Sequence, residues 1–118
     1  MTTAKKPLIG IVGPCGAGKT SLARRLRARG YRTRAISQEH SFVPDMWQRI
    51  TQPDILIFLQ ASHPVGGMRR KLDWTVSEWE EQQRRLSHAR AHADLYLDTD
   101  PLGISDVLEQ TLAFLGDR

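Results

Sequence analysis

The stretch Gly13-Pro14-Cys15-Gly16-Ala17-Gly18-Lys19-Thr20 has the spacing G-x-x-x-x-G-K-[ST] and decides the fold. An apolar run, residues 8–12, precedes it and is typical of a buried parallel strand. Residues 18–29 are rich in helix formers and end at Gly30. Because glycines let successive backbone N–H groups point into one hollow at a helix N-terminus, the stretch predicts a phosphate-binding loop.

Each part of this loop has an expected role. Lys19 would reach the β- and γ-phosphate oxygens of a nucleotide, and the Thr20 hydroxyl would ligate Mg²⁺. The residues expected to hold the phosphates are Gly13, Pro14, Cys15, Gly16, Ala17, Gly18, Lys19, Thr20 and Ser21. The alternative is a glycine-rich turn that carries Gly-Lys-Thr by coincidence.

Length and composition predict a single domain over residues 1–118. The chain has 118 residues, of which 40% are hydrophobic and 25% charged, as in globular proteins. The first seven residues lack the apolar segment of a signal peptide, and no apolar run has the length of a membrane span. The single cysteine, Cys15, excludes an internal disulfide, so we expect a cytoplasmic protein without a membrane partner. Oxidation of Cys15 would hinder phosphate binding, unless its side chain only fills space.

The net charge of +4 suits a polyanionic ligand. The basic side chains cluster at Arg24, Arg25, Arg27, Arg29, Arg32 and Arg34, at Arg69, Arg70 and Lys71, and at Arg84, Arg85 and Arg90. Such clusters fit nucleotide phosphates, fit nucleic acid, or are simply solvated.

Strand and helix signals alternate along the chain. Strands are expected at 8–12, at 31–37 near a sheet edge, at 54–59 in the centre and at 94–98. Helices are expected at 18–29, at 75–92 after a capping box (Thr75 and Glu78), and at 104–115. Residues 38–53 would be irregular with one helical turn around 45–50, and 62–74 would be a loop followed by a short basic helix. This alternation predicts an α/β three-layer sandwich around a parallel sheet of about four strands.

Several stretches together resemble the small P-loop kinases, above all uridine-kinase-like and other nucleoside or metabolite kinases of the P-loop NTPase superfamily, in a shortened form. The loop and residues 21–26 are similar to the first βα unit of these kinases, and residues 35–42 to the end of their second strand. Residues 54–61 with Arg69, Arg70 and Lys71 look like a strand leading into an arginine-bearing lid, and 93–100 like the last strand and the loop near the nucleotide.

The resemblance implies a P-loop NTPase fold, ATP and Mg²⁺ as cofactors, and phosphoryl transfer to a small metabolite or nucleoside. Glu39 would be the carboxylate near the acceptor hydroxyl or in the Mg²⁺ shell. Arg69 and Arg70 would neutralise charge on the transferring phosphoryl group, so the implied catalytic set is Lys19, Glu39, Arg69 and Arg70. A surface glutamate and a solvated basic helix are the alternatives.

Two departures from the family pattern favour a different function. These kinases have a further strand ending in the Walker B acid, but the roughly sixteen residues 38–53 hold no apolar strand. Gln60 ends the central strand where an acid could have stood, and an amide is a poorer Mg²⁺ ligand. A catalytically weak nucleotide-binding sensor or regulatory module, completed by a protein partner, is therefore the alternative to a kinase. A nucleic-acid-binding accessory is a third hypothesis, and we do not expect it.

The remaining candidates have simpler interpretations. His88 and His92 have i, i+4 spacing, but no third ligand accompanies them, so helix packing is favoured over a metal site. Trp74 would be the tryptophan placed to stack on an adenine base, although packing is favoured for all three tryptophans. Residues 98–100 would contact the base or cap a helix. No Asn-Lys-x-Asp stretch is present, which argues against guanine selectivity.

Overall fold

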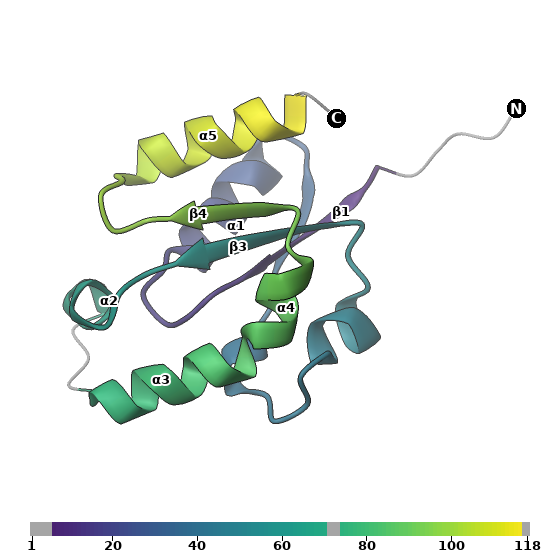
Figure 1. Cartoon of the computed structure of the whole chain (residues 1–118). Helices are drawn as coiled ribbons and strands as arrows, with labels where there is room; N and C mark the ends of the chain where they lie inside the picture. Colours follow the sequence, from purple (N-terminus) through teal and green to yellow (C-terminus); the bar gives the residue numbers. More distant parts are fainter. Residues whose placement is uncertain (1–5, 71–73, 117–118) are drawn as a thin grey trace, which may run out of the picture.

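The computed structural model describes residues 6–70 and 74–116 and consists of one parallel sheet with helices on both faces (Figure 1). The strands are β1 (Leu8–Val12), β2 (Arg32–Ala35), β3 (Ile55–Gln60) and β4 (Leu95–Asp98), in the order β2-β1-β3-β4. The helices are α1 (Lys19–Ala28), α2 (His63–Arg70), α3 (Val76–Arg85), α4 (Ser87–His92) and α5 (Ile104–Gly116), with two short ones, η1 (Gln38–His40) and η2 (Trp47–Thr51). The expected α/β class and four-stranded parallel sheet are confirmed. No described helix is both long and apolar enough to cross a membrane.

The two central strands are buried on both faces, which explains their continuous apolar sequences. In β1, Ile9 and Ile11 point toward α1 and α5, while Val12 points toward the opposite face. In β3, Ile57 and Phe58 divide between the same two faces. Each such side chain contributes about 1.5–3 kcal/mol through burial. The sheet therefore separates two apolar cores, and the glycine-containing loop after β1 is anchored on a rigid strand.

The second core holds the segment between β2 and β3 in place. Trp47 of η2 is only 5% exposed and packs in this core with Phe58 and Leu86. The buried Gln38 donates to the carbonyls of Val43 and Arg85 and accepts from the Trp47 N–H. Residues 38–53 are therefore fixed by buried contacts, and among them the structure shows two short helices but no strand.

Two helices differ from the sequence-based expectation. The segment expected to begin as a loop at residue 62 is helical from His63, directly after β3. Pro64 lies in the first turn, where its missing N–H costs nothing, and the Ser62 hydroxyl accepts from the Val65 N–H. The helix expected over 75–92 begins with the predicted capping box but bends at Leu86 into α3 and α4. At this bend the Ser87 hydroxyl donates a hydrogen bond to the Arg84 carbonyl. The side chain of Leu86, at the bend itself, is fully buried in the core.

The strand order creates a switch point at the carboxyl end of β1. The chain adds β2 on one side of β1 and β3 and β4 on the other. The chain leaves β1 through α1 on one face, whereas α4, which precedes β4, packs on the opposite face. In open α/β sheets, ligands bind outside the carboxyl ends of strands at such a point. Residues 13–20, called the glycine loop from here on, lie there.

Candidate functional site

The glycine loop is packed tightly between β3 and α2, and this packing requires glycine. A Cβ on Gly13 would lie 2.1 Å from the Leu59 carbonyl oxygen. Gly16 has a φ of 83°, and a Cβ there would lie 2.5 Å from the carbonyl oxygen of Gly66 in α2. The loop backbone is therefore in contact with two other segments before any ligand binds, and its shape is set in advance.

Several backbone donors of the loop remain free. The N–H groups of Gly18, Lys19, Thr20 and Ser21 make no hydrogen bond to any residue within 6–70 and 74–116. The neighbouring Cys15 N–H, by contrast, donates to Oε1 of Gln82 in α3 at 3.0 Å. The free groups stand at the N-terminus of α1, where the helix dipole adds partial positive charge. This end of α1 is suited to an anion.

Lys19 places its ammonium group at the centre of the site. Its Nζ lies 2.7 Å from Oε2 of Glu39 and donates to the carbonyl oxygens of Gly13 at 2.7 Å and Pro14 at 3.1 Å. Only 11% of the Lys19 side chain is exposed. The ammonium is thereby held beside the loop by three oxygens rather than extended into solvent.

Glu39 faces the glycine loop from η1. Its side chain is 5% exposed, and its second oxygen, Oε1, is buried without any hydrogen-bond partner among the described residues. An unsatisfied buried acceptor costs about 1–3 kcal/mol, and more when it carries charge. The carboxylate therefore bonds Lys19 through one oxygen, and its other oxygen has no partner among the described residues.

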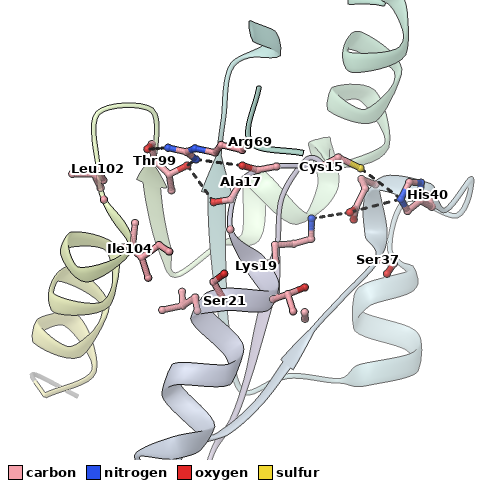
Figure 2. A pocket seen from close by; sticks show the side chains of 18 residues that line it. Cys15, Ala17, Lys19, Ser21, Ser37, His40, Arg69, Thr99, Leu102 and Ile104 are labelled. Carbon is pink, nitrogen blue, oxygen red and sulfur yellow. Dashed lines mark hydrogen bonds and ion pairs between the residues drawn. The ribbon is translucent and has the colours of Figure 1, made fainter. Parts of the chain in front are cut away.

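A pocket of about 660 Å³ opens between these groups (Figure 2), within the size range of small-molecule sites. At one end the apolar Leu102 and Ile104 line it, and at the other end Ser37 and His40 do so, with the glycine loop between them. The full lining is Cys15, Gly16, Ala17, Gly18, Lys19, Thr20, Ser21, Leu22, Ala35, Ser37, Glu39, His40, Arg69, Thr99, Leu102, Gly103, Ile104 and Val107.

The structure brings most of the predicted site residues together. Seven of the nine loop residues named from the sequence, 15–21, line the pocket, and Thr20 is exposed there. Gly13 and Pro14 do not line it; their backbone carbonyl oxygens instead accept hydrogen bonds from Lys19 Nζ. Arg70 ends α2, but its side chain lies outside the described residues.

Arg69 connects three segments around the loop. Its guanidinium donates to the Thr99 carbonyl at 2.6 Å, to the Thr99 hydroxyl at 2.9 Å and to the Gly16 carbonyl at 3.3 Å. The Thr99 hydroxyl in turn donates to carbonyl oxygens of Ala17 and Gln60. Arg69 therefore bridges the glycine loop, α2 and the segment after β4. Its two terminal guanidinium nitrogens already donate hydrogen bonds to these segments.

Some contacts of the site carry no signal in the sequence. Gln82, which holds the Cys15 N–H, is one of several polar residues in α3 and stands out by neither spacing nor type. From the sequence, Leu102 and Ile104 indicate only the start of the last helix and not a pocket wall. Gly66 was expected in a loop, so its helical packing against the glycine loop was not predicted either.

The other candidates are used in packing. The His88 and His92 rings stack with centroids 4.3 Å apart, and Trp47 Nε1 donates to His88 Nδ1 at 3.1 Å. Trp74 stacks on His63 and does not line the pocket. Gln60 is turned toward α3, where its amide pairs reciprocally with Gln83 at 2.7 and 3.0 Å.

No model of a known protein family matches this chain, and no curated protein shows significant similarity to it.

Proposed function

We propose that this chain is a P-loop protein that binds ATP with Mg²⁺ and transfers the γ-phosphoryl group to a small metabolite or nucleoside. The observation that carries the proposal is a group of donors in one pocket wall, all of which except the Lys19 ammonium are unbonded within the described residues. Four unbonded N–H groups, the Lys19 ammonium and the Thr20 hydroxyl all belong to the wall formed by the glycine loop and α1. Donors of this kind at a helix N-terminus fit a phosphate chain.

The residues present fit both cofactors. Lys19 is already placed at the loop and would exchange carbonyl contacts for phosphate oxygens. The exposed Thr20 hydroxyl would contribute to holding Mg²⁺. Leu102 and Ile104 give the far end of the pocket an apolar wall that fits a base or ribose.

Glu39 is the residue on which catalysis depends in this proposal. ATP supplies the phosphoryl group when it is bound. Glu39 then offers a carboxylate in the pocket wall, with one unpartnered oxygen, that would accept the proton of an attacking hydroxyl or orient a metal-bound water. Arg69 would keep the loop and the end of β4 at a fixed separation around the phosphates.

A second candidate is a nucleotide-binding sensor or regulatory module with little turnover. It is favoured by the direct pairing of β2 with β1, since no strand between β2 and β3 is present in the described chain to carry a further acid. Gln60, at the end of β3, faces Gln83 rather than the pocket. Glu39 would then serve only to balance the charge of Lys19.

Calorimetric titration of Mg·ATP and Mg·GTP, with phosphate release followed in the same samples, tests both functions. Lys19→Ala should bind at least about tenfold more weakly than wild type, since hydrogen bonds to charged groups contribute about 1.5–3 kcal/mol. Arg25→Ala removes an exposed positive charge from the same helix and is the matched control, which should bind normally. Lys19→Gln keeps a donor for Glu39 and serves if the alanine variant is unstable.

The outcome separates the two candidates. Binding with phosphate release that is lost in Lys19→Ala and Glu39→Gln supports a phosphotransferase. Binding without release, in the presence of a panel of nucleosides and small metabolites, supports the sensor. Equal behaviour of wild type and both Lys19 variants contradicts nucleotide binding at this loop.

A further inference from the structure

Three side chains with different donor atoms meet at one corner of the pocket, where Figure 2 shows Cys15 and His40 facing each other beside Lys19. The Cys15 Sγ lies 3.8 Å from His40 Nε2, and His40 Nε2 lies 3.9 Å from Oε2 of Glu39. One ligand atom of each residue falls within 4.8 Å of the other two. A thiol, an imidazole and a carboxylate therefore surround one small space.

The spacing is close to that of a tetrahedral zinc site. With Zn–S near 2.3 Å and Zn–N or Zn–O near 2.0–2.1 Å, neighbouring ligand atoms stand about 3.3–3.6 Å apart. The two measured separations exceed this by only a few tenths of an ångström. The third separation, between Cys15 and Glu39, is at most 4.8 Å, so the side chains must move closer together to bond one ion.

A second observation points to a ligand at this corner. The Glu39 side chain is 5% exposed, yet its Oε1 has no partner in the described residues. This oxygen belongs to the same carboxylate whose Oε2 lies near both His40 Nε2 and the Lys19 ammonium. A bound cation would satisfy this otherwise orphaned oxygen.

The thiol is held in position from the other side. Gln82 accepts from the Cys15 N–H and donates from Nε2 to Cys15 Sγ at 3.3 Å. Gln82 itself is buried, with 8% exposure. Such contacts orient a metal ligand before the metal arrives.

We propose that Cys15, Glu39 and His40 form a Zn²⁺ site with its fourth position open to the pocket. The donor set selects the cation, because sulfur and imidazole ligands suit Zn²⁺ whereas Mg²⁺ prefers oxygen ligands alone. Binding releases the Cys15 thiol proton to solvent, and the thiolate, the neutral imidazole and the carboxylate share the metal. The site stands independently of the proposed nucleotide function, although both use Glu39.

Titration of Co²⁺ and then Zn²⁺ into the full chain tests the site. Cys15 is the only cysteine, so any near-ultraviolet thiolate–Co²⁺ absorption reports this residue alone. We expect one Co²⁺ per chain, displaced by Zn²⁺, with an absorption that disappears in Cys15→Ser and Cys15→Ala. Affinity should fall more than about tenfold in His40→Ala and Glu39→Gln, because loss of even an indirect partner of a metal ligand costs that much.

His92→Ala is the matched control. His92 stacks on His88, away from the proposed site, so this variant should bind the metal as wild type does. Absence of the thiolate absorption in wild type overturns the proposal, as does binding that depends on His92 but not on His40. Variants that lose binding must keep the circular dichroism spectrum of the wild type. Zn²⁺ should also raise the melting temperature of wild type but not of Cys15→Ala; an equal rise in both overturns the site.

Discussion

The Lys19 ammonium and the Glu39 carboxylate form a largely buried ion pair, 2.7 Å apart, that joins the start of α1 to η1. The two residues follow neighbouring parallel strands, and both strands end at the same edge of the sheet. The pair thereby places the main cation and the main carboxylate of the pocket in direct contact.

Removing only one member of this pair should destabilise the fold. Lys19→Ala leaves the Glu39 carboxylate buried without its partner, so we expect a loss of about 3–5 kcal/mol in urea unfolding. The double variant Lys19→Ala with Glu39→Gln should recover part of that loss, because the uncompensated charge is gone. A double variant less stable than either single variant would contradict this account.

Gly16 should tolerate substitution less well than Gly18. Both have positive φ, so alanine at either position carries backbone strain of about 1–2 kcal/mol. A Cβ on Gly16 also meets Gly66 at 2.5 Å, whereas nothing lies within 4 Å of one on Gly18. Urea unfolding should therefore show a larger loss of stability for Gly16→Ala than for Gly18→Ala. Equal losses would mean that the contact with α2 relaxes freely.

Arg69 should act through its shape as well as its charge. The fork bonds Gly16 and Thr99, and a lysine ammonium cannot reproduce that arrangement. Arg69→Lys is therefore expected to weaken Mg·ATP binding several-fold, nearly as much as Arg69→Ala, in calorimetric titration. Full recovery by lysine would instead assign Arg69 a role through charge alone.

An acid at the end of β3 should not create activity. The Gln60 side chain pairs with Gln83, and neither residue lines the pocket. Gln60→Glu should leave Mg·ATP affinity and phosphate release unchanged while it lowers stability by about 1 kcal/mol through the lost amide pair. A gain in phosphate release would show that this side chain does reach the metal.

The pH dependence of stability should include a contribution from α3. A hydrogen bond from Arg84, opposed by desolvation, holds the pKa of Glu81 below its ordinary value of 4.5. Because this pKa is lower in the folded chain than in the unfolded one, the stabilisation is present above pH 4.5 and is lost as the pH falls through the folded value. Glu81→Gln should thus lower stability slightly at pH 7 but not at low pH.

Local patterns predicted the parts of the molecule that depend on local physics. The glycine loop, β1 and α1 follow from residue spacing, and the capping box at Thr75 follows from two side chains three residues apart. The expected loop at 62–74 was wrong in part, because Gly66 is helical where it packs on the glycine loop. Contacts between distant segments, such as that of Gln82 with Cys15, depend on the packing of α3 and carry no sequence signal.

The two ends of the pocket are built from segments that lie at different separations along the sequence. The glycine loop, Lys19 and Glu39 all come from the β1–α1–β2 unit and the turn after it, so only short chain loops must close to bring them together. The apolar wall at Leu102 and Ile104 follows β4, which pairs with β3, so it depends on contacts between segments farther apart along the chain. Folding should therefore organise the polar half of the pocket through early, local contacts, and the apolar half would complete it last.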